Sequence, residues 1–233
     1  MGRVGVLLLG MAAAAVAAAV ALAAQSPKQL RAAMLKAAAA QRSVHYVSTS
    51  SVPGHAIRVV SDVGRDRGIQ RITVTSHGRS GPATVLVVGR TAYIRGNAFT
   101  LHNYFPLTQA QAGSYAGKWI SIPSTSGAYS IVAADATFAS FVADLLPSKH
   151  LAVVRATVAG RRSVGVRGTV RQTGRTLVEI VYAPAVGTPL PSEEKAFPAG
   201  RTGTSLTHMS RWNEPVHLAA PANAVPIATV VGQ

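Results

Sequence analysis

The sequence predicts an α+β protein in which a large antiparallel sheet is covered on one face by a few short helices. Two observations carry this prediction. Segments with strict two-residue alternation of polar and apolar residues follow one another without a helix between them, and glycines separate them at hairpin spacing. Parallel βαβ architecture is disfavoured because it requires a helix between successive strands. Apolar residues make up 48% of the 233 residues, enough to form a core and to exclude a disordered chain.

The first segment predicts export. One arginine near the start is followed by an uncharged stretch from Val4 to Ala24, and Ala21-Leu22-Ala23 suits signal-peptidase cleavage. An uncleaved anchor is the alternative, because a span of about 20 apolar residues crosses a bilayer. We therefore expect residues 1–24 to be a signal peptide or an N-terminal membrane anchor, and residues 25–233 to be a single domain with an irregular C-terminal tail. The protein would be extracytoplasmic, either secreted or anchored by this segment.

The next segment predicts a helix and then a series of strands. Ser26-Pro27 before KQLRAAMLKAAAAQR provides an N-cap and a proline at the first helical position, and Leu30, Met34 and Leu35 form a narrow apolar stripe. The period then changes to two residues, as in the alternation of Val44 and Tyr46 with His45 and Val47. Five consecutive strands are expected before residue 97, the last two being ATVLVVG and TAYIRG.

Residues 97–146 predict the helices that cover the sheet. They hold 8 of the 13 aromatic residues in short helical and turn segments. In the last of these, Asp135 is the expected N-cap, and Phe138, Phe141 and Leu145 recur at helical spacing before Pro147.

Strands resume after residue 149, and their two faces differ. In RRSVGVRGTVRQ, valines at 164, 166 and 170 lie on one face, and Arg167, Thr169 and Arg171 lie on the other. The Pro-rich stretch APAVGTPLPSEEKAFPAG predicts a long loop in which Glu193 and Glu194 are solvated. The pattern thus favours a sheet with an apolar inner face and arginine on its outer face.

The motifs for catalysis are missing. The chain has no cysteine, no G-x-S-x-G elbow and no phosphate-binding glycine loop, and its seven histidines show no metal-ligand spacing. The eight carboxylates are too few to favour acid/base or oxygen-ligand metal sites, and Asp62 and Asp66 are expected to form surface ion pairs with nearby arginines. We therefore expect no enzyme activity, no catalytic residue, no metal and no cofactor.

The charge predicts an anionic partner. The formal net charge is +15, and it becomes +14 if the leader with Arg3 is removed. For an exported protein the candidates are anionic membrane surfaces and wall polymers. Nucleic acid is disfavoured because the basic residues occur singly in strands without interleaved stacking aromatics. A monomer is expected.

Four local motifs point to a family: TAYIRGNAFTL at 91–101, SYAGKWISIP at 114–123, GTPLP at 187–191 and SRWNEPVHLAAPANAVPIA at 210–228. With them the chain resembles exported LolA-like envelope lipid carriers of the LppX-LprG type, in a branch from high-GC Gram-positive bacteria, over residues 26–229. The resemblance implies a strongly curved antiparallel half-barrel whose concave apolar face is covered by helices, with a cavity for acyl chains between them. Ala24-Gln25-Ser26 stands where the mycobacterial lipoproteins carry a lipidated cysteine.

Two hypotheses follow. In the first, the protein is a non-enzymatic carrier that binds an acyl-chain lipid, a lipoprotein or another hydrophobic ligand between sheet and helices. In the second, it is a surface module with a solid core that docks on anionic lipids or polymers through its arginine face. The residues expected to line the hydrophobic interior are Met34, Phe99, Phe105, Tyr115, Trp119, Phe138, Phe141 and Leu145.

Overall fold

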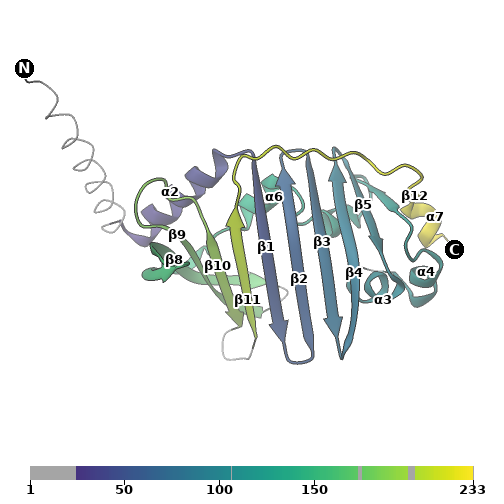
Figure 1. Cartoon of the computed structure of the whole chain (residues 1–233), viewed down its shortest axis with the longest axis horizontal. Helices are drawn as coiled ribbons and strands as arrows, with labels where there is room; N and C mark the ends of the chain where they lie inside the picture. Colours follow the sequence, from purple (N-terminus) through teal and green to yellow (C-terminus); the bar gives the residue numbers. More distant parts are fainter. Residues whose placement is uncertain (1–24, 106, 173–174, 199–202, 233) are drawn as a thin grey trace, which may run out of the picture. The chain divides into compact units, whose positions relative to one another are not determined.

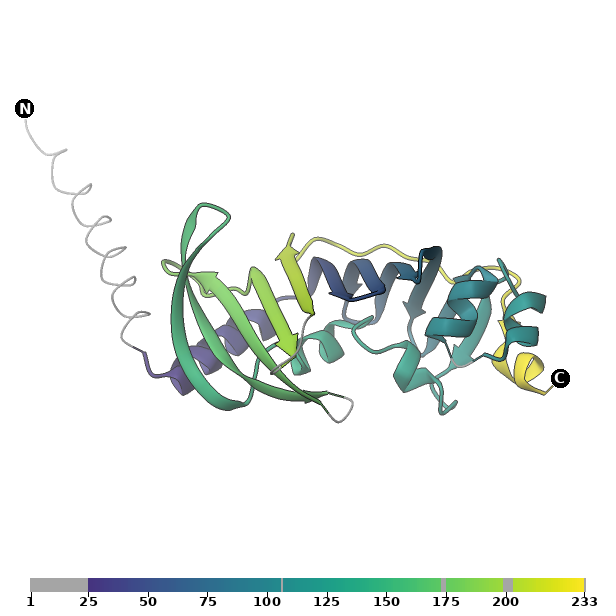
Figure 2. The ribbon, with the colours of Figure 1, turned by 90° about the horizontal axis from the view of Figure 1, so that it is seen from below.

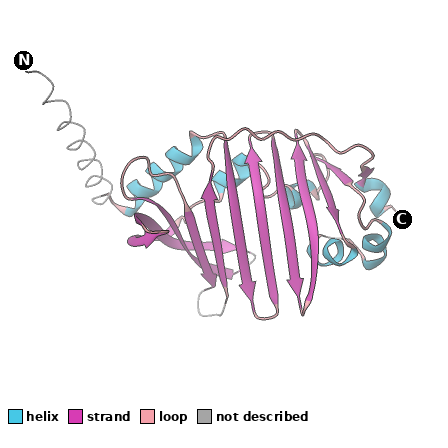
Figure 3. Cartoon of the chain, viewed as in Figure 1, coloured by secondary structure: helices cyan, strands magenta, loops and turns pink. Residues whose placement is uncertain are grey.

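Two compact units make up the chain in the computed structural model, which describes residues 25–105, 107–172, 175–198 and 203–232. Unit 1 combines the chain up to Ala40 with residues 145–200, and unit 2 combines residues 41–144 with residues 201–233. The expected signal segment, residues 1–24, lies outside the described residues. Figures 1 and 3 show the helices and strands of both units.

Unit 2 is built on eight strands in the order β12-β6-β5-β4-β3-β2-β1-β11. Every neighbouring pair in this order is antiparallel except β12 and β6, which are parallel. The first five strands are successive hairpins, as the alternation and the glycines predicted. The strands are β1 (Ser43–Val52), β2 (His55–Gly64), β3 (Arg67–Ser76), β4 (Arg79–Val88), β5 (Thr91–Gly96), β6 (Ile120–Pro123), β11 (Thr204–Ser210) and β12 (Val225–Pro226).

Short helices cover one face of this sheet. They are α3 (Ala98–Tyr104), α4 (Gln109–Ser114), α5 (Tyr129–Val132), α6 (Phe138–Ala143) and α7 (Ile227–Val231). Side chains of Asn97, Thr108 and Thr137 cap α3, α4 and α6 at their N-termini. The expectation that Asp135 caps the last helix of this segment is wrong. Asp135 has a φ of 56°, outside the extended region that an N-cap adopts, and the helix begins two residues later than predicted behind Thr137.

The register of β1 to β5 separates two faces. One row across these strands joins Tyr46, Ser61, Gln70, Val85 and Ile94, and we call the face that carries it the inner face. It packs against α3, α4, α5 and α7 in one apolar core that includes Leu101, Phe105, Tyr115, Val132 and Val230.

The opposite, outer face carries Arg58, Arg71 and Arg95, all exposed. The predicted distribution of apolar and arginine side chains is therefore confirmed for unit 2.

Unit 1 has four antiparallel strands in the order β10-β9-β8-β7 and one helix. Helix α2 (Pro27–Ala39) contacts β7 (Lys149–Val158) and β8 (Arg161–Gln172) and buries Leu30, Met34 and Ala38. The other strands are β9 (Arg175–Pro184) and β10 (Glu193–Pro198). Figure 2 shows the strong bend of β7, β8 and β9.

The structure corrects one prediction in unit 1. The proline-rich stretch before residue 199 is not wholly a loop, because Glu193–Pro198 pairs with β9 as β10. Glu193, expected in a solvated loop, is consequently buried and forms an ion pair of 3.1 Å with Lys195. Both units thus consist of mostly antiparallel sheet, curved and unclosed, with helical cover on an apolar face, which confirms the predicted fold class.

Candidate functional site

Two hollows in unit 2 are candidates for a functional site, one on each face of the sheet. The first, here called the inner pocket, lies between the inner face and the segments at residues 104–105 and 131–135 that cover it. Its volume is about 270 Å³. It is lined by Tyr46, Ser48, Val59, Gln70, Val85, Tyr104, Phe105, Ile131, Val132, Ala134 and Asp135.

A small polar network forms one wall of the inner pocket. The Tyr46 hydroxyl donates to the backbone carbonyl of Asp135 at 2.9 Å and accepts from Gln70 Nε2 at 2.7 Å. Both side chains are buried, and burial raises the pKa of Tyr46 well above its usual range. The phenol therefore stays protonated and keeps its hydrogen bond to the covering segment at every physiological pH.

Asp135 is the one ionisable acid at this pocket, and its environment favours the neutral form. Although the residue as a whole is exposed, the apolar walls desolvate its carboxyl group, and the charge of Asp144 acts in the same direction. Both effects raise the pKa of Asp135 above its ordinary value. The lining contains no lysine or arginine, so the pocket has no positive charge to offer an anion.

Apolar side chains are exposed where this cover meets solvent. Ile131 is 69% exposed and Tyr104 is 41% exposed, although their neighbours Val132 and Phe105 are buried. Ile131 lies in α5, which has four residues and no side-chain cap. Helices this short have little stability of their own and depend on packing. The cover of the inner pocket is therefore held weakly at this point.

The eight residues predicted to line the interior are distributed over both units. Met34 and Leu145 are buried in unit 1, and the other six lie in unit 2. Phe105 is the member of this set that lines the inner pocket. The role of these eight residues in binding a ligand stays a prediction.

The remaining five occupy different surroundings. Phe138 and Phe141 form edge contacts with Trp212, and Phe141 also stacks on Tyr46 at 5.1 Å. Tyr115 belongs to the solid core. Phe99 lies under the guanidinium of Arg79, and Trp119 lies under that of Arg95.

Tyr46, Gln70 and Asp135 line the pocket but were not predicted to do so from the sequence. The signal available for the first two was a polar side chain at an inner-face position of an otherwise apolar alternation.

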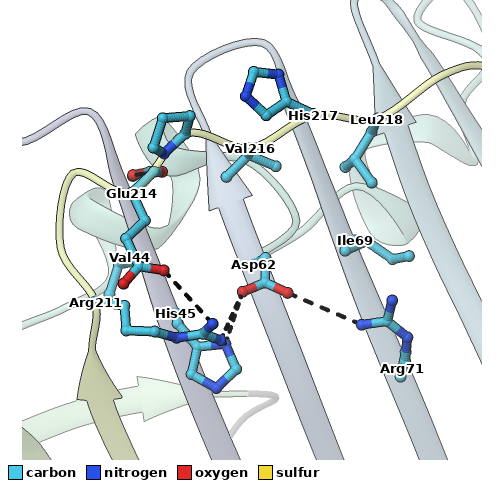
Figure 4. Close-up of a pocket in the computed structure, with 12 residues that line it drawn as sticks. Val44, His45, Asp62, Ile69, Arg71, Arg211, Glu214, Val216, His217 and Leu218 are labelled. Atoms are coloured by element: carbon cyan, nitrogen blue, oxygen red, sulfur yellow. Dashed lines mark hydrogen bonds and ion pairs between the residues drawn. The ribbon is translucent and has the colours of Figure 1, made fainter.

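The second hollow, here called the strap pocket, lies on the outer face under residues 214–218, which run from β11 across β1, β2 and β3 (Figure 4). Its volume is about 280 Å³. Asp62 is at its centre. The Asp62 carboxylate contacts His45 Nδ1 at 2.7 Å, Arg211 Nη2 at 3.2 Å and Arg71 Nη1 at 3.9 Å. Arg211 also contacts His45 Nδ1, and its Nη1 lies 3.5 Å from Glu214.

A histidine hydrogen-bonded to a carboxylate is a feature of hydrolytic sites. The groups around His45 therefore decide whether it can act as a general base. A general base must also have a proton-donating nucleophile within hydrogen-bond reach of its other ring nitrogen. In the described part of the chain His45 makes no such bond to a hydroxyl through Nε2. The nearby hydroxyl of Ser43 instead donates to the carbonyl of Glu214 at 2.5 Å.

Further contacts show that this cluster anchors the chain after β11. Asn213 Oδ1 accepts from the backbone N–H of Arg42 at 2.7 Å, and the Asn213 N–H donates to the carbonyl of Ser43 at 3.1 Å. Val216 packs 3.4 Å from the position that a Cβ at Gly64 would occupy. The expected ion pair of Asp62 with Arg71 is present but long, and Asp66 pairs with Arg67 at 3.0 Å as expected. The strap pocket is best explained as the anchor of residues 211–218.

The described residues lack two features that would indicate other kinds of function. They contain no group of three or more histidine or acidic side chains placed to hold a metal ion. Within the same residues, no helix has the length and apolarity required to cross a bilayer.

Known structures share this architecture, although no protein-family model matches the chain and no curated protein matches its sequence. LprF from Mycobacterium bovis superimposes with a TM-score of 0.52 at 16% identity, over 84% of this chain and 97% of that one. Lipoprotein LppX from Mycobacterium tuberculosis matches with a TM-score of 0.48 at 15% identity, over 81% and 96% of the two chains. The chain therefore has the LolA-like fold of LprF, in agreement with the resemblance that its sequence motifs indicated.

Proposed function

We propose that this protein is a non-enzymatic carrier that binds an acyl chain or a similar hydrophobic ligand in the inner pocket of unit 2. The observation that carries the proposal is the pocket itself, which lies between the inner face of the sheet and a cover with exposed apolar side chains. Its volume of about 270 Å³ is close to the lower limit of about 300 Å³ for small-molecule sites. The LppX-LprG resemblance supports the same class of ligand.

The cover explains how such a ligand would enter. Helix α5 and the loop up to Thr137 contribute Ile131, Val132, Ala134 and Asp135 to the pocket, and one side-chain hydrogen bond, from Tyr46 to the carbonyl of Asp135, ties this segment to the sheet. Displacement of the segment would enlarge the pocket along the inner face without disturbing the hairpins beneath. A longer acyl chain would therefore lie along Val59 and Val85, which already line the wall.

The chemistry of the lining supports entry of the apolar end first. No lysine or arginine lines the pocket, and burial raises the pKa of the Asp135 carboxyl above its ordinary value. An anionic head group would find no counter-charge inside and would remain at the mouth, near Tyr104. Transport of a hydrophobic ligand as a monomer outside the cytoplasm, after export through residues 1–24, is the physiological role that we infer.

Co-purified lipid and an acyl probe test the proposal. We expect organic extraction of the purified protein, followed by mass spectrometry, to release acyl lipid, and a fluorescent fatty acid to bind with one-to-one stoichiometry. Ala134→Trp places an indole in the lining and should weaken the probe at least tenfold. Ala139→Trp, at an exposed position of α6 outside the lining, is the matched control and should bind as the parent does.

Three results would count against the carrier. Extraction without lipid, together with no binding of the probe, would leave the inner pocket without a ligand of this class. Equal binding by both tryptophan variants would place the site elsewhere. An equal loss in both variants, with unchanged thermal unfolding, would show that the probe adsorbs to the protein surface.

A further inference from the structure

The β7–β8 hairpin of unit 1 contains six basic residues and no acidic residue. Residues 149–172 contain Lys149, Arg155, Arg161, Arg162, Arg167 and Arg171, and they contain no Asp, no Glu and no aromatic residue. A hairpin without an acidic residue is unusual for a solvated sheet surface, where both signs are ordinarily mixed. Nothing in the inner pocket makes use of this charge, because the pocket is in unit 2.

The register places most of these side chains on one face. Arg161 is opposite Val158, Arg167 is opposite Ala152, and Lys149 is opposite Thr169. Because residues two apart in a strand share a face, Lys149, Arg161, Arg167 and Arg171 all point to the same side of the hairpin. Val164, Val166 and Gly168 point to the other side and are buried. From Arg161 to Arg171 the row extends over about 33 Å at the usual rise of a strand.

The four side chains of this row are exposed to solvent. Among the described residues none of the four takes part in an ion pair. Of the acids of unit 1, Glu193 pairs with Lys195 at 3.1 Å and Glu179 is buried. In unit 2, by contrast, Asp66 is bound to Arg67, and Asp62 is bound to Arg211. Four cationic side chains without an ion pair in the described structure therefore share one face of this hairpin.

The tip of the hairpin projects beyond its neighbour. The last residue pair between β8 and β9 is Ser163 with Pro184, so residues 158–162 extend past the end of β9 (Figure 2). Ala159 and Gly160 form the turn with φ values of 47° and 76°. Arg161 and Arg162 follow directly and point to opposite faces, so the tip presents positive charge to both sides.

We propose that the β7–β8 hairpin is a docking surface for anionic phospholipid membranes. A row of exposed cationic side chains without ion-pair partners complements a layer of phosphate head groups, and each basic side chain near such a surface strengthens binding about fivefold. Single-stranded nucleic acid is disfavoured as the partner because the hairpin has no aromatic side chain on which bases could stack. This inference goes beyond the carrier function and does not depend on the inner pocket.

Vesicle binding by charge-matched variants tests the proposal. The full chain is titrated with vesicles of 30% phosphatidylglycerol in phosphatidylcholine, and with phosphatidylcholine alone. The hairpin variant R161Q/R167Q/R171Q and the unit 2 variant R42Q/R58Q/R65Q remove the same charge. The three control side chains are exposed and form no ion pair in the described part of the structure. All three proteins carry the same N-terminal segment, so its own membrane affinity cancels.

We expect the parent and the control to bind the anionic vesicles in a salt-dependent manner, and the hairpin variant to bind about a hundredfold more weakly. An equal loss in both variants would show that bulk charge alone is responsible, and no loss in either would show that the hairpin does not contact lipid. Tighter, equally hairpin-dependent binding to duplex DNA than to vesicles would assign the surface to nucleic acid instead. A normal acyl-probe affinity in the hairpin variant separates this outcome from failure of the carrier function.

Discussion

Gly68→Ala should loosen the cover of the inner pocket, because Gly68 lies where that cover contacts the sheet. Gly68 is on the inner face of β3, beside Val63 of β2 and Val87 of β4. A Cβ at this position would lie 2.0 Å from the carbonyl oxygen of Ala136 and 3.2 Å from Val63. The first contact is with backbone, which cannot swing aside as a flexible side chain could.

The structure gives the size of the effect. Relief of the contact to about 3 Å requires the loop at Ala136 to move by about 1 Å, and overpacking of this kind costs about 1–3 kcal/mol. The hydrogen bond from Tyr46 to the adjacent carbonyl of Asp135, now 2.9 Å, would stretch, at a further cost of about 1 kcal/mol. Together the two contributions come to about 2–4 kcal/mol, which corresponds to a fall in Tm of roughly 4–16 °C for a domain of this size.

Thermal unfolding followed by circular dichroism measures this directly, and urea unfolding gives the free energy. Gly113→Ala is the matched control, because a Cβ there meets nothing within 4 Å and the residue has an ordinary helical position in α4. We expect the control to unfold at or slightly above the parent temperature. A Gly68→Ala protein that unfolds within 1 °C of the parent would refute the claim that the Ala136 loop is packed against β3.

Two other predictions concern Tyr46 and Asp62. Tyr46→Phe removes the hydroxyl between Gln70 and Asp135, leaving the buried Gln70 amide without that acceptor, and should cost about 1–3 kcal/mol by urea unfolding. Because the pKa of Tyr46 is raised on folding, its stabilisation is complete below its unfolded value of about 10 and is lost as the pH rises further. The parent should therefore lose stability faster than Tyr46→Phe between pH 9 and 11, and parallel curves would contradict the buried phenol. Asp62→Asn should leave the fold intact but lower the free energy of local opening of residues 211–218 by about 1 kcal/mol, so that hydrogen exchange in this segment becomes faster. Unchanged exchange there would show that the anchor lies elsewhere.

The secondary structure of the first half of unit 2 could be predicted because its causes are local. Alternation over β1 to β5 and glycines at the turns determine which residues share a face, and the expected placement of arginine on the outer side holds for Arg58, Arg71 and Arg95. β10 could not be predicted in the same way. Its residues lie in a proline-rich stretch, which is typical of a loop. They form a strand because they pair with β9, for example Glu193 with Tyr182, and this contact joins separate segments of the chain.

The candidate site was predicted less well than the fold. Aromatic content selected residues that the structure places mainly in the solid core, such as Tyr115, or against other rings, such as Phe141. The wall of the inner pocket instead depends on Tyr46 and Gln70, which are 24 residues apart, and on the backbone of Asp135. This wall could not be predicted from the sequence, because each of its polar groups forms its hydrogen bond with a residue of another element.

The sequence by itself determined which side chains of each strand lie on the apolar face and which lie on the solvent face. It also determined where the hairpins turn, and that the β7–β8 hairpin contains six basic residues and no acid. These properties depend only on residues that are close in sequence, because the two-residue period of a strand decides which of its side chains share a face. Only the tertiary structure decided which segment covers the inner face, how much space it leaves and which charges stay unpaired. Those outcomes depend on contacts between residues far apart in sequence, such as Ala136 with Gly68 and Arg211 with Asp62.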